Sequence, residues 1–215
     1  EAKAALIKIL NEFKGKEKKI GEGLKDTYQE QLRQESEVGK CGWQDQYAVA
    51  FGGINYISFS KLKKIGYPLR IKNETIRELE SHLLLVDTER NHDAKNLEKR
   101  NLETMTQEKA TKMIETAQNI RELIFAGKIG NIGSILNEAW KLKRNEITTN
   151  PEIDKLYDFG MSNGAIGGKL LGAGDGGHMM FFCYPINRGK LIEACNKENY
   201  KCFCPNLTEK GAETW

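Results

Sequence analysis

The sequence predicts an α+β fold, because two kinds of hydrophobic periodicity occur within one chain of 215 residues. Apolar residues recur at steps of three and four over several long segments, which is typical of amphipathic helices. Between these segments lie short runs that alternate or are uniformly apolar and are bounded by glycine-rich turns, as in strands joined by hairpins. Strands interleaved with helices, together with antiparallel hairpin signals, indicate an α+β sandwich.

Short segments with strand character occur in both halves of the chain. Residues 54–59 alternate apolar and polar positions after a turn or close-approach point at Gly52-Gly53, and residues 60–66 read as a hairpin connection. The run Leu83-Leu84-Leu85-Val86 is uniformly apolar, which predicts a strand buried on both faces. The expected strands are 54–59, 68–72, 82–86, 178–184 and 200–204.

The helices are predicted from apolar periodicity and from their start and stop signals. Gly127 ends the periodic segment that begins near Thr104. Asn150-Pro151-Glu152 predicts a helix start, with Asn as N-cap and Pro in the first turn, and Asn163-Gly164 predicts the end of the same helix. The expected helices are 1–14, 24–37, 104–126, 129–144, 150–163 and 187–197.

Charge and composition argue against several classes of protein. The 33 basic and 30 acidic residues give a formal charge of +3, which is too balanced for a nucleic-acid-binding surface. No apolar run approaches the roughly 18 to 20 residues needed to span a membrane, and no signal peptide is recognisable. Five cysteines, an odd and scattered number, argue against a disulfide framework and for a reducing compartment. We therefore expect a cytoplasmic protein without nucleic-acid or membrane partners.

Six glycines occur within the eleven residues from Gly167 to Gly177, directly ahead of an apolar run. We expect a loop that exposes its backbone, because consecutive peptide N–H groups without Cβ atoms can turn toward one anion. Lys169 would add a positive charge. The spacing matches neither the nucleotide P-loop nor the dinucleotide-binding motif, so a phosphate or substrate loop and a plain flexible turn both stay open.

A second candidate site is Gln44-Asp45-Gln46-Tyr47, which follows a glycine-rich approach and precedes Phe51-Gly52-Gly53. An aspartate held between two amides suits a catalytic carboxylate. The alternative is a helix N-terminus at which Asp45 only complements the helix dipole, and the local sequence by itself favours this second interpretation.

Taken in order, the Gln-Asp-Gln-Tyr motif, a helical block and the glycine-rich segment before an apolar strand resemble the GHMP kinase superfamily. The chain is most similar to sugar-1-kinases that act on D-glycero-D-manno-heptose 7-phosphate, with fucokinase-like members as near neighbours. The segments PLRIK at 68–72 and NPEIDKLY at 150–157 fit that branch as well. The resemblance extends over the whole chain, is strong in the two motifs and is loose in the first forty residues.

This resemblance implies a GHMP-kinase-like two-layer sandwich whose C-terminal part is ferredoxin-like with an added helical block. It implies the remainder of an N-terminal domain at 1–75 and a C-terminal domain at 76–215. The implied activity is ATP- and Mg²⁺-dependent phosphorylation of a hydroxyl, expected to be the anomeric one, of a heptose 7-phosphate-like sugar phosphate. The alternatives are a non-catalytic sugar-phosphate-binding module or pseudokinase that lacks the nucleotide loop, and an enzyme of this fold with another chemistry. A homodimer is left open.

The resemblance also assigns roles to individual residues. Asp45 matches the catalytic base or the group that orients the attacking hydroxyl, which accords with phosphoryl transfer carried by positioning and charge neutralisation. Glu35 is the expected metal ligand, with Glu30 as the other candidate. Substrate contacts are expected from Gln44, Gln46, Tyr47, Lys169 and His92. The expected phosphate or nucleotide loop consists of Gly172, Gly174, Asp175, Gly176 and Gly177.

The chain departs from the family pattern at several positions. Asp175 replaces a glycine and His178 replaces a large apolar residue in the glycine-rich motif. An aspartate inside an anion-binding loop repels phosphate unless it points away or meets a cation. Asn91-His92 replace a Thr-Arg pair after the buried strand, and the family's phosphate-binding loop, of the Pro-x-x-x-Gly-Leu-Gly-Ser-Ser type, is not found in these residues.

Overall fold

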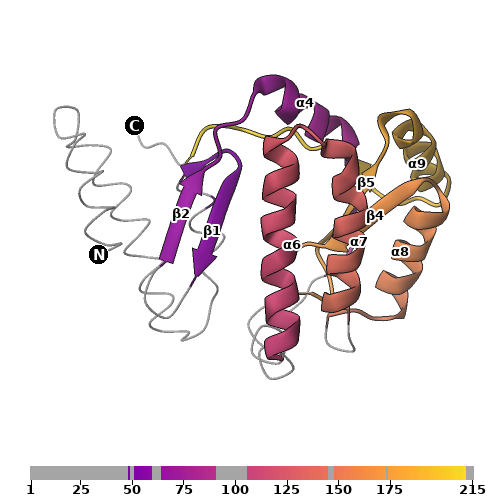
Figure 1. Cartoon of the computed structure of the whole chain (residues 1–215). Helices are drawn as coiled ribbons and strands as arrows, with labels where there is room; N and C mark the ends of the chain where they lie inside the picture. The colour runs from indigo at the N-terminus through magenta and orange to yellow at the C-terminus, as the bar shows by residue number, and fades with distance from the viewer. Residues whose placement is uncertain are drawn as a thin grey trace, which may run out of the picture. The chain divides into compact units, whose positions relative to one another are not determined.

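The computed structural model describes residue 48 and residues 51–59, 64–90, 106–144, 148–172 and 174–211 (Figure 1). These residues fall into two compact units. One unit takes the residues up to Arg70 together with those from Leu207 onward, and the other comprises Ile71–Asn206. The predicted helices at 1–14 and 24–37 lie outside the described residues.

The first unit contains an antiparallel hairpin of β1 (Asn55–Phe59) and β2 (Lys64–Pro68). Strand β1 confirms the prediction for 54–59. The prediction of a strand at 68–72 is wrong, because the chain turns back sooner and pairs with β1 from Lys64 onward. Pro68, which has no N–H to donate, is the last residue of β2.

The two glycines ahead of β1 allow a close approach of two backbone segments of this unit. Gly52 has φ +64°, and a Cβ atom on it would lie 2.2 Å from the backbone nitrogen of Gly211. The N–H of Gly53 donates to the carbonyl of Thr208 at 2.8 Å. The glycine pair therefore permits the C-terminal segment to pack directly on this backbone, which is one of the two roles expected for it.

The second unit is built on a four-stranded antiparallel sheet in the order β4-β5-β3-β6. Along the chain, helices separate β3 from β4 and β5 from β6, and this β-α-β-β-α-β sequence with that strand order is the ferredoxin-like arrangement. It confirms the predicted α+β class. The strands are β3 (Leu83–Asp87), β4 (Ala165–Leu170), β5 (His178–Cys183) and β6 (Cys202–Phe203).

Four helices of this unit follow the predicted segments, and two further helices occur among the described residues. A short 3-10 helix, η1 (Ile129–Asn131), precedes α7, and α6 and α7 lie side by side (Figure 1). Helix α4 (Asn73–His82) was not anticipated from the sequence. The confirmed helices are α6 (Gln107–Phe125), α7 (Ile132–Lys143), α8 (Pro151–Ser162) and α9 (Pro185–Lys197).

Helices cover both faces of the sheet, because successive side chains of β5 belong to two different buried clusters. Phe181 belongs to a buried cluster with Leu156 of α8 and Leu191 of α9, whereas its neighbour Phe182 belongs to a second cluster with Ile132 of α7. Successive side chains of a strand point to opposite faces, so the two clusters lie on the two sides of the sheet. Helices α8 and α9 form the ferredoxin-like layer, and α6 and α7 form the added helical block.

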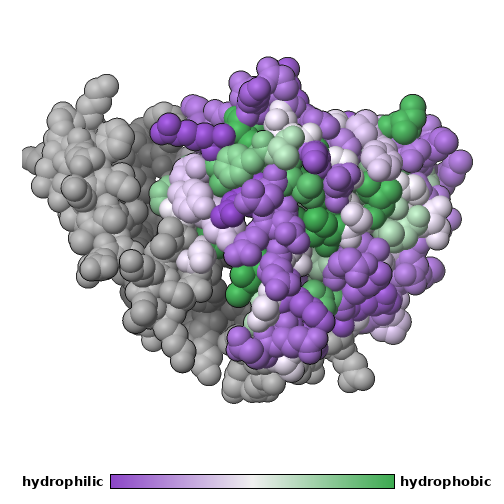
Figure 2. Space-filling model, viewed as in Figure 1, coloured by the Kyte–Doolittle hydropathy of each residue, from purple (hydrophilic) through white to green (hydrophobic). Residues whose placement is uncertain are grey.

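Hydrophilic residues dominate the face of the molecule drawn in Figure 2, and the hydrophobic ones form separate areas among them. Among the described residues, the exposed large hydrophobic side chains include Ile114 of α6 and Ile186 of α9, which are 58% and 83% exposed. None of the described helices combines the length and the apolar character needed to cross a membrane.

Candidate functional site

The glycine-rich segment has two structurally different halves. Residues 167–170, expected to belong to a loop, are part of strand β4, and only residues 171–177 connect β4 to β5. A Cβ atom on Gly167 would lie 1.8 Å from the carbonyl oxygen of Gly133 in α7, and one on Gly168 would lie 2.7 Å from the carbonyl oxygen of Met180. The first two glycines therefore serve close packing, and the expectation of a loop there is wrong.

The second half, residues 172–177, is called the glycine loop below. Four of its residues have positive φ angles: +73° at Gly172, +125° at Gly174, +53° at Asp175 and +90° at Gly177. This region of backbone space is open to glycine and strained for most side chains, although aspartate tolerates it better than most. The loop conformation thus explains the glycines at these positions, and Asp175 is the exception.

Three neighbouring segments fix the glycine loop by hydrogen bonds. The N–H of Asp175 donates to the carbonyl of Thr148 at 3.1 Å, and the carbonyl of Gly177 accepts from the N–H of Thr88 at 2.9 Å and from its hydroxyl at 2.8 Å. Lys143, the last residue of α7, donates from Nζ to the carbonyl of Gly172 at 2.5 Å. The loop is therefore anchored to the ends of β3 and α7 and to the segment that precedes α8.

Two N–H groups of the loop have no acceptor in the described part of the chain. The amides of Asp175 and Gly177 donate to protein carbonyls, whereas no hydrogen bond is formed by the amides of Gly174 and Gly176 to any described residue. Both of these glycines are buried. Buried backbone donors are nearly always paired in folded proteins, so these two N–H groups fit an external acceptor such as a phosphate oxygen.

The carboxylate of Asp175 faces groups of the protein. Its Oδ1 accepts a hydrogen bond from Nδ2 of Asn150 at 2.6 Å and lies 3.8 Å from a guanidinium nitrogen of Arg90. The other terminal nitrogen of Arg90 contacts Glu152. Asp175 thus meets a cation, the condition under which an aspartate is compatible with an anion-binding loop.

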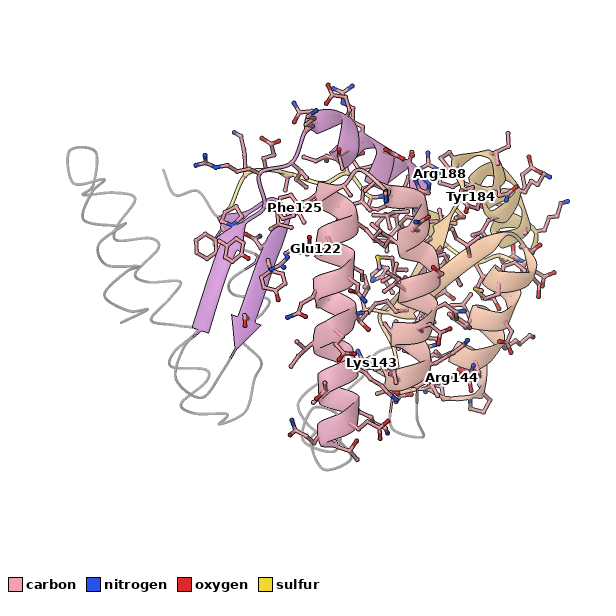
Figure 3. All side chains as sticks on the ribbon, in the orientation of Figure 1. Glu122, Phe125, Lys143, Arg144, Tyr184 and Arg188 are labelled. Carbon is pink, nitrogen blue, oxygen red and sulfur yellow. The ribbon has the colours of Figure 1, made fainter. Side chains whose placement is uncertain are left out.

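The N-terminus of α8, which begins where the sequence predicted a helix start, contacts the glycine loop through Asn150. Oδ1 of Asn150 accepts from the N–H groups of Glu152 and Ile153, each at 3.0 Å, which makes Asn150 the N-cap of the helix. Next to it, Arg144 is paired with Asp154 at 2.9 Å. Figure 3 shows Lys143 and Arg144 at one end of α7, and Tyr184 and Arg188 near its other end.

Lys169 adjoins the loop but belongs to β4, where it is directly opposite Met180 of β5. Burial lowers the pKa of its ammonium group, although the residue as a whole retains part of its surface. Within the described ranges no carboxylate pairs with it. A desolvated ammonium without a counter-ion is the kind of group that an anionic ligand would stabilise.

Most of the other predicted site residues lie outside the part of the chain that the structure describes. The glycine-loop residues are brought together with Lys169 close by in the chain, whereas the remaining candidates lie outside the described residues: Glu35, Gln44, Asp45, Gln46, Tyr47 and His92. Within the described ranges, no group of three or more His, Cys, Asp or Glu side chains is placed so that it could hold a metal ion.

Sequence reasoning missed two residues of this site. Arg90 and Asn150 both approach Asp175, from positions 85 and 25 residues earlier in the chain. A signal for Arg90 was present in the sequence, because it lies three residues after the end of the apolar strand β3 and directly before Asn91-His92. Asn150 was recognised only as a helix cap.

A family model and a curated relative both connect this chain with the GHMP kinases. Residues 120–202 match the family model described as GHMP kinases C terminal. Over 181 residues the chain is 35% identical to the D-glycero-alpha-D-manno-heptose 7-phosphate kinase of Campylobacter jejuni subsp. jejuni serotype O:2, a match that covers 81% of this chain and 53% of the relative.

Two crystal structures share the fold at similar identity. A candidate sugar kinase from Campylobacter jejuni has a TM-score of 0.68 and 31% identity, over 88% of this chain and 56% of that one. A D-glycero-D-manno-heptose 1-phosphate kinase from Bacteriodes thetaiotaomicron has a TM-score of 0.61 and 28% identity, over 85% and 51%. The chain spans about half the length of these relatives. Together with the ferredoxin-like sheet and its glycine loop, these matches place the chain in the GHMP kinase superfamily.

Proposed function

We propose that this chain acts as an ATP-dependent sugar or sugar-phosphate kinase whose acceptor is a hydroxyl, expected to be anomeric, of a heptose 7-phosphate-like substrate. The observation that carries the proposal is the pair of unpaired amides of Gly174 and Gly176 in a loop that hydrogen bonds hold to the ends of β3 and α7 and to the segment before α8. Two buried amide donors in one short loop suit a phosphate group as acceptor. The substrate class is taken from the two relatives that are heptose phosphate kinases.

The proposed chemistry needs little covalent participation from the protein. Phosphoryl transfer is carried by positioning and by neutralisation of the charge on the phosphoryl oxygens. Bound ATP supplies the phosphoryl group. The amides of Gly174 and Gly176 and the ammonium of Lys169 hold phosphate oxygens, and Asp45 accepts the proton of the attacking hydroxyl.

Further contacts are proposed on the strength of the family resemblance. Glu35 is the proposed metal ligand. The proposed sugar and sugar-phosphate contacts are Gln44, Gln46, Tyr47 and His92.

The test is an assay of ADP formation with a panel of sugar phosphates that includes D-glycero-D-manno-heptose 7-phosphate. Replacing Asp45 by Asn should lower kcat by about 10² to 10⁴-fold, the usual contribution of a general base. A matched control is Asp158→Asn, because Asp158 is an exposed residue of α8. Equal activity of the Asp45→Asn variant would contradict the role of Asp45. Sugar-phosphate binding by calorimetry without ADP formation would favour the non-catalytic alternative.

A further inference from the structure

Asp175 is an unexpected residue for its place in the fold. It adopts φ +53° between Gly174 and Gly176, where glycine would carry no steric cost. Its side chain adds a negative charge to a loop whose free amides suit an anion. A residue that is unfavourable on both counts calls for a compensating interaction, and the contacts of its carboxylate supply one.

The compensation comes from the side-chain amide of Asn150, which binds two elements at once. Its oxygen caps α8 through the amides of Glu152 and Ile153, and its NH₂ group donates to Asp175 at 2.6 Å. The orientation of the Asn150 amide is therefore determined from both ends. One side chain couples the helix N-terminus to the glycine loop.

Arg90, which follows β3, makes a second set of contacts with the glycine loop. Its guanidinium contacts Glu152 and lies 3.8 Å from Asp175, while its carbonyl accepts from the N–H of Gly177 at 3.4 Å. The carboxylate of Asp175 is held by one hydrogen-bond donor, Asn150, and by the nearby positive charge of Arg90, so its own charge is partly neutralised within the protein.

We propose that Asp175 is a positioning residue: through Asn150 and Arg90 it holds the glycine loop in its anion-binding conformation before the ligand arrives. The inference rests on the proposed function, because it assumes that the amides of Gly174 and Gly176 receive a phosphate. Fixing a loop in its bound conformation removes the entropic cost of ordering it at the moment of binding. Asp175 thus raises the affinity of the glycine loop for phosphate by keeping the loop ordered, although its own charge repels the anion.

The experiment exchanges the donor and the acceptor between positions 150 and 175 in the full chain. Asn150→Asp keeps a good N-cap but removes the donor and opposes two carboxylates. Asp175→Gly tolerates the positive φ angle and removes the carboxylate. The double variant N150D/D175N restores an amide-to-carboxylate hydrogen bond with the original total charge, because asparagine also tolerates this backbone region. Glu108→Gln is the control, since Glu108 is an exposed carboxylate paired with Lys112 on α6.

Two readouts are needed. Hydrogen exchange of residues 174–177 without ligand reports the order of the loop, and calorimetry with inorganic pyrophosphate reports anion binding. Asn150→Asp and Asp175→Gly should exchange about tenfold faster in the loop and bind pyrophosphate about five- to tenfold more weakly. The exchanged pair should return both values to within about twofold of the parent, and Glu108→Gln should change neither.

The opposite results would overturn the inference. If Asp175 only repelled the anion, Asp175→Gly would bind pyrophosphate more tightly than the parent. Unchanged exchange in the single variants, or an exchanged pair as impaired as Asn150→Asp, would also refute it. A parent protein that binds no pyrophosphate would instead refute the proposed phosphate site, and a parent that binds it but phosphorylates no sugar would refute the kinase activity alone.

Discussion

At the scale of single residues, the glycine-rich motif has two physical explanations that one string of letters cannot separate. Gly167 is required because α7 packs directly on β4, whereas Gly172, Gly174 and Gly177 are required by positive φ angles. The abundance of glycine was readable from the sequence. The reason why position 167 requires glycine could not be read from the sequence, because the atom that excludes a side chain there belongs to Gly133, 34 residues earlier.

The replacement Gly167→Ala should therefore destabilise the protein. The new methyl group would be placed against a helix backbone, which cannot move aside as a flexible side chain can. We expect a loss of about 3 kcal/mol in the free energy of unfolding, at the upper end of overpacking effects.

Urea denaturation measures this loss, and Gly189→Ala is its control. Gly189 is an exposed residue of α9 with open space around its Cβ position, so alanine there should raise stability by about 0.5 to 1 kcal/mol. A Gly167→Ala variant as stable as the parent would mean that α7 and β4 are not in direct backbone contact.

At the scale of elements, those with local start and stop signals were predicted best. Helix α8 runs between its predicted Asn-Pro start and Asn-Gly end. Helix α4 was missed because it is dominated by charged and polar residues, and only Ile76 and Leu79 give it an apolar spacing. Strand β4 was missed because Gly167-Gly168 is a turn signal in local sequence, and only packing against α7 makes it a strand.

Removing the cap of α8 should affect more than the helix. Asn150→Ala eliminates the acceptor for two helix amides and also the donor to Asp175, so we expect a loss of about 2 kcal/mol, the upper range for an N-cap. Thr106→Ala removes the N-cap hydrogen bond of α6, which involves only Lys109.

The control variant Thr106→Ala should lose about 1 kcal/mol in the free energy of unfolding and leave the glycine loop unchanged. Thermal unfolding gives the stabilities, and hydrogen exchange of residues 174–177 tests the loop. If Asn150→Ala and Thr106→Ala had the same effect on both measurements, α8 and the loop would not be coupled through Asn150.

At the scale of the whole molecule, the ferredoxin-like topology assembles the candidate site. Antiparallel pairing of β3 with β5 brings Thr88 and Arg90 beside Gly177, and α7 and α8 meet the same edge through Lys143 and Asn150. The motif itself was recognisable in the sequence. The partners of Asp175 could not be recognised in the sequence, because they come from two other segments of the chain. A contact between distant segments leaves no local pattern.

Lys169 links the global stability to pH. Burial lowers the pKa of its ammonium below the usual 10.5, so between the two values the unfolded chain holds a proton that the folded chain has released. Stability rises with pH wherever the unfolded state binds more protons, so folding should become more favourable as the pH increases through this interval. At pH values below this interval, the buried positive charge of Lys169 destabilises the folded state.

Lys169→Met should therefore be more stable than the parent near pH 7, and its advantage should shrink as the pH approaches 10.5. Urea denaturation at several pH values measures the difference. Lys155→Met on the exposed side of α8 is the control, and its difference from the parent should not follow this trend. An advantage of Lys169→Met that stayed constant with pH would come from better packing of methionine, and the ammonium of Lys169 would then be solvated, not desolvated.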